Sequence, residues 1–337
     1  MPHGEPQLAT PVNDDAGAVT AQEAPLAEVG SKVIRVVDRR EFVRFAHLYR
    51  VLHACMIVSF LTLAVTGLSL KFSYTPWASR FSRLLGGFET AGYVHRFAAI
   101  IMFGTFTAHV IGLFKQKRRN QTTWKAVLFG PNTLLPTKRD GQEFVGTMKW
   151  FVGRGPRPEY GRWTYWEKFD YFAVFWGIVV IGSTGLTLWF PVFFTRFLPG
   201  SFINVATIIH SDEALLATGF IFTVHFFNTH LRPEKFPMDT TIFTGHMPLA
   251  ELKRDKPREY AALVASGELE QHLEEPQPAI VVKTIRVFAW IALGTGFSVV
   301  VWILYAMLFA YRYSTNPRAC RCRESRRECR PEIRLSK

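Results

Sequence analysis

The chain has 337 residues, of which 48% are hydrophobic, 15% aromatic and 20% charged, and its formal net charge is +13. Its charged fraction lies below the roughly 25% of average soluble proteins. Because the apolar residues form long uncharged stretches, a soluble enzyme, a disordered chain and a transmembrane β-barrel are all excluded. No zinc or helix-turn-helix pattern supports a nucleic-acid partner.

Taken in chain order, five windows lack charged residues. They hold 20, 18, 25, 18 and 25 residues: Val51–Leu70, Phe97–Phe114, Tyr171–Thr195, Ala214–Leu231 and Val287–Tyr311. A helix needs about 20 residues to cross a bilayer, so each window predicts one transmembrane helix, called spans 1 to 5 below. The predicted fold is all-α, an integral membrane four-helix bundle with a fifth transmembrane helix.

The spans divide the chain into five predicted parts. These are a disordered cytoplasmic extension (1–31), the four-helix domain (32–231), a cytoplasmic loop (232–283), the fifth transmembrane helix (284–312) and a basic tail (313–337). Residues 1–30 contain no Lys or Arg and no apolar run, which excludes a signal peptide and favours disorder. The tail holds Cys320, Cys322 and Cys329 without a regular metal-ligand spacing. In the loop, His246 and His272 are expected on the surface.

The distribution of Lys and Arg predicts the orientation. The segment 31–50 carries 6 of them, the loop 115–168 carries 12 and the loop 231–283 carries 7, against 3 in 71–92 and 1 in 191–204. Basic loops stay in the cytoplasm, so the N-terminus is predicted inside and the C-terminus in the periplasm. The tail after span 5, with 9 basic residues, opposes this orientation, but four earlier spans support it.

Spans 1–2 and 3–4 repeat one pattern. Thr66-Gly67 near the end of span 1 returns as Thr184-Gly185 near the end of span 3, at an offset of 118. In span 2, Gly104 follows His95 by nine residues, and in span 4 Gly219 follows His210 by nine, at an offset of 115. The core is therefore predicted to be two copies of one helical hairpin, an arrangement that can hold cofactors between facing helices.

Histidines inside membranes are costly and usually functional. Those in or at the ends of the spans are His53, His95, His109, His210 and His225. On an ideal helix, steps of 14 and 15 residues return to within about 40° and 60° of the starting direction and rise about 21–23 Å. His95 and His109 therefore share one face and His210 and His225 another, with one member of each pair near each side of the membrane.

This spacing predicts two stacked haem groups, since two axial imidazoles fill both open positions of a haem iron and favour electron transfer over oxygen binding. Gly104 and Gly219 lie between the two levels, where either a porphyrin edge or a close helix contact would need space. A dinuclear iron site would need Glu-x-x-His motifs, and the spans contain none.

The stretch Arg50-Val-Leu-His53, the Thr66-Gly67 end of span 1, Tyr93-Val-His95-Arg96 and the pair His210 and His225 resemble a known family. It is the bacterial cytochrome b561-like membrane subunit, a dihaem cytochrome b, of formate dehydrogenases, nickel–iron hydrogenases and thiosulfate reductases. The resemblance covers roughly residues 40–232. It implies an outer haem on His95 and His210, an inner haem on His53 and His225, and a quinone beside the inner haem in the stretch 161–168.

Three features depart from that family. The span-4 histidines are 15 residues apart, where the family usually has 14, and Thr164 stands at the place of a typical asparagine in the quinone stretch. His109 is additional, and its depth makes it either an alternative inner ligand in place of His53 or a ligand of a third haem. His230 lies about 200° around an ideal helix from His210, so it is expected to face away from the outer haem.

The repeat places Tyr171 where the first hairpin has His53. Beside it the start of span 3 carries four quinone candidates, Tyr165, Glu167, Lys168 and Asp170. Two interpretations stand: an interfacial aromatic belt with solvated charges, or a quinone pocket in which one of the charged groups exchanges a proton.

The sequence thus predicts a b-type dihaem cytochrome, an electron-transfer subunit of a quinone-linked oxidoreductase in the bacterial inner membrane. Its cofactors would be two haem b, with a third as the alternative, and quinone its substrate. Its partners would be lipid and a redox subunit, either an iron–sulfur protein or a multihaem cytochrome c. One rival is a stand-alone oxidase or reductase acting at an exposed haem, and the other is a channel or transporter.

Overall fold

The computed structural model of the protein describes residues 27–29, 32–34, 40–232, 235–236, 238–305 and 308. It divides into two units, 1–39 and 40–337. In the first unit, β1 (Ala27–Val29) and β2 (Lys32–Ile34) pair antiparallel, with Ala27 opposite Ile34. Residues 27–29 belong to the extension for which the sequence predicts disorder, a prediction that concerns residues mostly outside the described ones. The cysteines of the tail lie outside the described residues.

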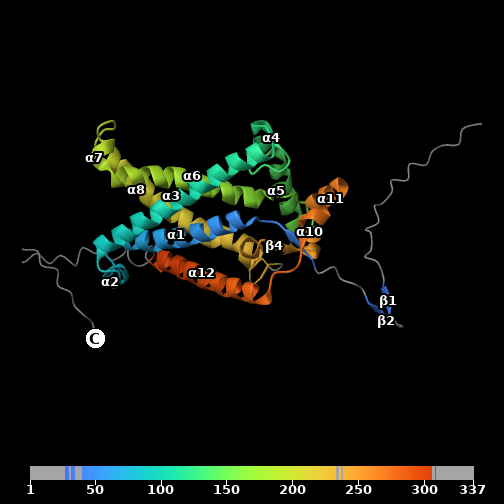
Figure 1. Ribbon diagram of the computed structural model, residues 1–337. Helices are drawn as coiled ribbons and strands as arrows, with labels where there is room; N and C mark the ends of the chain where they lie inside the picture. Colours follow the sequence, from blue (N-terminus) through green and yellow to red (C-terminus); the bar gives the residue numbers. More distant parts are fainter. Residues whose placement is uncertain are drawn as a thin grey trace, which may run out of the picture. The chain divides into compact units, whose positions relative to one another are not determined.

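Within the described residues of the second unit, five helices are long and apolar enough to cross a membrane. They are α1 (His47–Lys71), α3 (Phe88–Arg119), α6 (Tyr165–Trp189), α8 (Phe202–Phe220) with its continuation to Leu231, and α12 (Ala279–Tyr305). They run side by side in Figure 1. The predicted all-α integral membrane bundle is confirmed, and α12 begins five residues before the predicted span at 284.

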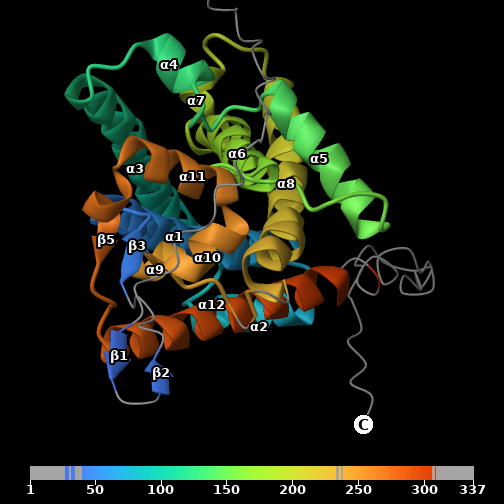
Figure 2. The same cartoon turned by 90° about the vertical axis from the view of Figure 1, so that its right-hand side faces the viewer.

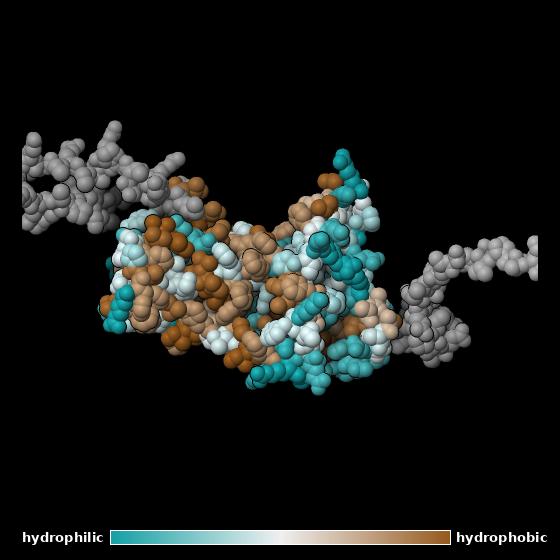
Figure 3. Space-filling view, turned by 90° about the horizontal axis from the view of Figure 1, so that it is seen from above, coloured by the Kyte–Doolittle hydropathy of each residue, from teal (hydrophilic) through white to brown (hydrophobic). Residues whose placement is uncertain are grey.

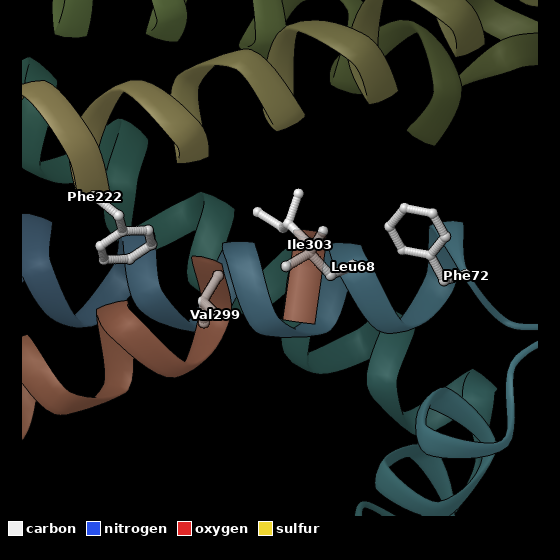
Figure 4. Packing of buried hydrophobic residues seen from close by; sticks show 5 residues of the cluster. All are labelled: Leu68, Phe72, Phe222, Val299 and Ile303. Carbon is white, nitrogen blue, oxygen red and sulfur yellow. The ribbon is translucent and has the colours of Figure 1, made fainter. Parts of the chain in front are cut away.

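The helices associate as predicted hairpins. α1 packs along α3, and α6 packs along α8. α12 packs against α1 and the continuation of α8 through a buried apolar cluster, shown in Figure 4: Leu68, Phe72, Phe222, Val299 and Ile303. The cluster explains how a helix without a counterpart in the repeat is fixed to the bundle.

Small hydroxyl residues face the interior of the spans. Ser59, Thr66 and Thr184 are buried, and each hydroxyl donates to the carbonyl four residues earlier at 2.6–2.8 Å. In lipid such groups must find partners within the protein, and small side chains allow close helix approach. Figure 3 shows hydrophobic residues over the middle of the bundle and hydrophilic residues gathered toward the end with α10 and α11.

At one end, α2 (Pro76–Leu84) and α7 (Pro191–Phe194) close the turns between spans. At the other end the residues after span 4 form a folded cap, which Figure 2 views with α10 and α11 in front. The cap contains α9 (Thr241–Thr244), α10 (Leu249–Asp255), α11 (Pro257–Ser266), the short 3₁₀ helix η3 (Leu269–His272) and three antiparallel strands.

The strands are β3 (Glu41–Val43), β4 (His246–Pro248) and β5 (Leu273–Glu274), in the order β4-β3-β5. Phe42, Met247 and Leu252 form their buried apolar core. The predicted loop is thus a small packed layer. His246, predicted on the surface, is buried, because its strand lies in this core and its Nε2 lies 2.9 Å from Gln277 Nε2. His272 is exposed, as predicted.

Gly245 sets the turn between α9 and β4. Its φ of +84° is the left-handed conformation that glycine adopts without strain, and a Cβ there would lie 2.8 Å from the carbonyl oxygen of Phe45. Its own carbonyl accepts hydrogen bonds from the backbone N–H groups of Arg44 and Phe45. The turn therefore fixes the cap to the chain that enters α1.

The loop between spans 2 and 3 contains α4 (Trp124–Phe129) and α5 (Lys138–Phe151). α5 buries its polar residues Asp140, Glu143 and Thr147. Asp140 accepts a hydrogen bond from Lys168 of α6 at 3.0 Å, and Glu143 one from Arg258 of α11 at 3.1 Å. Buried acids need such partners, so these two ion pairs hold α5 against the start of α6 and the cap.

A buried ion network joins the cap to the start of α6. Arg44 donates to Glu259 at 3.0 Å and lies 3.5 Å from Glu167, while Arg162 donates to the other Glu259 oxygen at 2.8 Å. The Arg44 and Glu259 side chains are only 1% and 6% exposed. Removing one member of a buried pair leaves the other charge without compensation, which costs about 3–5 kcal/mol.

We therefore predict that Glu259→Gln destabilises the protein by about 3–5 kcal/mol, measured as a fall in the thermal unfolding midpoint in detergent. Glu270→Gln is the matched control, because Glu270 pairs with Arg40 at the surface with 70% of its side chain exposed, and such pairs contribute about 0–1 kcal/mol. Equal effects of the two substitutions would contradict the network's role.

Candidate functional site

A cavity of about 2320 Å³ lies among α1, α3, α6 and α8. Seven of the ten histidines line it: six lie on the membrane-spanning helices (His53, His95, His109, His210, His225 and His230), and His272 lies in the cap. The predicted histidine site and the principal cavity therefore coincide.

His95 of α3 and His210 of α8 face each other. Their ring centroids are 6.2 Å apart, and the ring planes are inclined by 74°. Each Nδ1 is held by a hydrogen bond: His95 Nδ1 lies 3.0 Å from Thr66 Oγ1, and His210 Nδ1 lies 2.9 Å from the carbonyl oxygen of Ile181. On both rings the Nε2 atom is left as the nitrogen able to bind a metal.

The repeated Thr-Gly pairs shape both positions. Thr184 Oγ1 lies 3.4 Å from His210 Nδ1, as Thr66 Oγ1 lies near His95. A Cβ on Gly67 would lie 3.2 Å from His95 Cε1, and one on Gly185 would lie 3.0 Å from His210 Cε1. In each hairpin, the threonine orients the imidazole and the glycine leaves room for it. The repeat was visible in the sequence, but this role was not recognised from it.

The separation of the two rings fits a metal ion between them. A metal–imidazole bond is about 2.0–2.1 Å long, and the ring nitrogen lies roughly 1.1 Å from the ring centre. Two imidazoles on opposite sides of one metal ion therefore have ring centroids about 6.2–6.4 Å apart. Among the described residues no three His, Cys, Asp or Glu side chains gather into a metal-binding group. Two imidazoles without further protein ligands suit haem, whose porphyrin supplies the remaining nitrogens.

A second level of histidines lies toward the cap. His225 Nδ1 is 2.9 Å from Asp170 Oδ2, an arrangement typical of a metal-ligating histidine oriented by a carboxylate. His53 lies within electrostatic reach of His225 and His230, and its Nδ1 is buried without a hydrogen-bond partner among the described residues. A buried nitrogen without a partner costs free energy. The surroundings of the His53 ring are apolar, with the centroid of the Phe243 ring 5.8 Å away. A metal bond to the His53 ring would be compatible with such surroundings.

His109 is engaged differently. Its Nε2 lies 3.0 Å from the hydroxyl oxygen of Tyr171, so in this structure its Nε2 is occupied by a hydrogen bond. This hydrogen bond favours His53 as the inner ligand. It argues against the alternative, left open by the sequence, that His109 takes the place of His53.

His230 lies at the second level, with its Nδ1 buried and without a partner among the described residues. Its direction differs from that on an ideal helix because α8 continues as two π-helical stretches, η1 (Ile221–His225) and η2 (Phe227–Leu231). The Phe226 N–H bonds to the Ile221 carbonyl and the Arg232 N–H to that of Phe227. A π turn holds about one more residue than an α turn, so directions calculated for an ideal helix do not apply here.

The same π stretch accounts for the spacing of 15 residues between His210 and His225. It lies between them and absorbs one extra residue, which turns His225 back toward the face of His210. His225 and His230 are neighbours on one helix, so they cannot lie on opposite sides of one metal ion. His53, from a different helix, can face either of them.

The four quinone candidates do not gather at one point. Glu167 caps α6 through Thr164 and accepts a 2.5 Å bond from Lys256 of the cap. Lys168 pairs with Asp140, and Asp170 pairs with His225. Tyr165 packs against Phe144, at a centroid distance of 5.6 Å. Of the four, only Glu167 and Asp170 line the cavity.

Gly104 and Gly219 stand in open surroundings. A Cβ at either would meet no heavy atom of the described residues within 4 Å. A close helix contact, one of the two predicted reasons for these glycines, is therefore absent there among the described residues.

Comparison with known proteins bears on the first hairpin. Residues 30–130 match a family model described as prokaryotic cytochrome b561. The matched stretch includes α1 to α4 and contains His53, His95 and His109. The match confirms, over this stretch, the resemblance stated from the sequence. Together with the five apolar helices it suggests a multi-pass bacterial membrane protein similar to b-type cytochromes. No curated protein matches the chain.

Gly185→Ala is predicted to weaken haem retention about tenfold, a change of about 1.4 kcal/mol. The reason is that the new methyl group would press on His210 Cε1 at 3.0 Å. Gly177→Ala in the same helix is the control, because its Cβ would meet Ile181 Cδ1 at an ordinary 3.8 Å. Haem loss to an excess of apomyoglobin measures the effect, and equal loss from both variants would refute the role of Gly185.

A second prediction concerns Lys256. Burial lowers its pKa from 10.5 to about 8, against the attraction of Glu167. Between these values the unfolded chain binds more protons at this site than the folded protein, so this contribution to stability rises with pH from about 8 to 10.5. Below pH 8 the cost of the buried charge is fully present.

Lys256→Met should therefore remove a positive slope from the dependence of the unfolding midpoint on pH between 8 and 10.5. Thermal unfolding in detergent at a series of pH values measures the slope. Lys253→Met, at an exposed position of α10, should retain the wild-type slope, and a wild-type slope in Lys256→Met would contradict the prediction.

Proposed function

We propose that this protein is a dihaem b-type cytochrome that transfers electrons between the quinone pool and a partner redox subunit of a respiratory oxidoreductase. One haem is held by His95 and His210 and the other by His53 and His225. The observation that carries the proposal is the opposed pair of imidazoles, 6.2 Å between centroids, each seated by a repeated Thr-Gly pair.

The bound haems would supply reversible one-electron chemistry between ferric and ferrous iron. The residues of the chain determine what that chemistry serves. At each level two histidines would hold the haem iron and would leave oxygen no free coordination site. Thr66, Ile181 and Asp170 hold the Nδ1 atoms and so fix which nitrogen is presented.

Two levels of histidines separated along α8 would connect the two sides of the membrane for electrons. His210 lies in the half of this span that follows α7, and His225 lies in the half that leads to the cap. With the predicted orientation, the cap faces the cytoplasm and the His95–His210 level faces the periplasm. The partner would be an iron–sulfur or multihaem cytochrome c subunit, as the resemblance implies.

A stand-alone oxidase or reductase is the second candidate function. It requires an iron with an open axial position or a haem edge that a soluble substrate can reach. The paired histidines favour the electron-transfer function, because each level supplies two ligands.

The assignment is tested by counting haems. His95→Ala and His210→Ala should each lose the same haem, about half of the total, because an iron with one axial ligand is held less firmly. The pyridine haemochrome assay gives the count, and the reduced-minus-oxidised spectrum shows which haem remains. Full haem content in either variant would contradict this pair.

The second level has a matched comparison. His53→Ala should lose the other haem, whereas His109→Ala should keep both, because the His109 ring is bonded to Tyr171. The same assay applies. Loss of a haem from His109→Ala, with retention in His53→Ala, would transfer the ligand role to His109.

A further inference from the structure

The His109–Tyr171 pair lies in the cavity without a place in the haem assignment. His109 belongs to α3 and Tyr171 to α6, and both line the cavity. Their hydrogen bond is 3.0 Å long, and the Tyr49 ring lies 6.2 Å from that of His109. The Tyr49 hydroxyl in turn donates to Gln116 at 3.0 Å.

The internal repeat relates this pair to the inner haem ligands. The offset of 118 that carries Thr66-Gly67 onto Thr184-Gly185 also carries His53 onto Tyr171. His109 of α3 corresponds to His225 of α8 once the extra residue absorbed in η1 is counted. His109 and Tyr171 therefore occupy, in one half of the bundle, the position that His53 and His225 occupy in the other.

At this related position the chain places a hydrogen-bonded histidine and tyrosine instead of two histidines. A tyrosine hydroxyl both donates and accepts. With the His109 Nε2–H as donor to the Tyr171 oxygen, Tyr171 keeps its own proton to donate to a ligand carbonyl oxygen. The charged groups nearby are already committed: Glu167 to Lys256, Lys168 to Asp140, and Asp170 to His225.

The surroundings suit a flat aromatic ligand that arrives from lipid. Phe106 and Phe175 stack edge to face at 5.1 Å, about one helical turn from His109 and Tyr171. Phe175 also lines the cavity. Phe172, next to Tyr171 in the chain, does not line it and is 47% exposed on a membrane-spanning helix, so the cavity wall at Tyr171 adjoins a surface turned toward the bilayer.

We propose that the His109–Tyr171 pair binds one ring oxygen of a quinone, between the aromatic side chains of α3 and α6. This inference rests on the proposed function and names the site where its quinone binds. It also gives His109 a role distinct from haem ligation. The site lies one to two turns deeper in α6 than the first-turn residues Tyr165 and Glu167.

The test is direct binding of a short-chain ubiquinone, and separately of menadione, to the purified full-length haem-loaded protein by titration calorimetry. Tyr171→Phe removes one hydroxyl and keeps the ring, so we expect affinity to fall about tenfold, the equivalent of one hydrogen bond. Haem content and spectrum should stay unchanged. Tyr74→Phe, 61% exposed near α2, should bind as the wild type does.

Each result has one meaning. Wild-type affinity in Tyr171→Phe would overturn the proposed location, and a tenfold loss in Tyr165→Phe instead would move the ring to the first turn of α6. Haem loss from His109→Gln would make His109 a ligand and also overturn the inference. If the wild type binds neither quinone while carrying two haems, the quinone part of the proposed function fails together with this site.

Discussion

The bundle depends on holding imidazole rings at fixed orientations inside a membrane. A polar ring in lipid must have its hydrogen bonds supplied by the protein, and a ligand ring must in addition leave one nitrogen free. The Thr66 hydroxyl and the Ile181 carbonyl meet the first need, and Gly67 and Gly185 make the space for the second. The pairing of helices in the two hairpins follows from this. α1 must contact the His95 ring of α3, and α6 must contact the His210 ring of α8.

The cap serves the other end of the same structure. Its buried charges bond to the first turn of α6, through Glu167 and Lys256, and to α5 through Glu143 and Arg258. Asp170, one turn further along α6, orients His225. The ion network thus fixes the start of α6, the helix whose Asp170 positions His225. The packed layer of strands and short helices is therefore an extension of the four-helix bundle.

The spans, the repeat and the cavity histidines could be predicted because charge, length and spacing determine them. The partners of these residues could not be predicted. His109 bonds to Tyr171, which lies 62 residues away in the sequence, and Lys168 bonds to Asp140 of a helix that hydropathy does not reveal. His230 was considered only in relation to His210, and its place in the cavity near the cap depends on the π-helical stretch, which the sequence pattern does not reveal. His246 was misjudged because a long polar loop gave no sign of its packed core.

The π-helical stretch at 221–225 also affects how this sequence should be aligned. Without a gap, the offset of 115 that superimposes His95 on His210 pairs His109 with Val224 and leaves His225 opposite Val110. One gap placed within η1 restores the correspondence of His109 and His225 and keeps the earlier positions in register. The extra residue is thus an insertion that the helix accommodates by local widening, and an ungapped alignment would report a histidine as lost where it has only been displaced by one position.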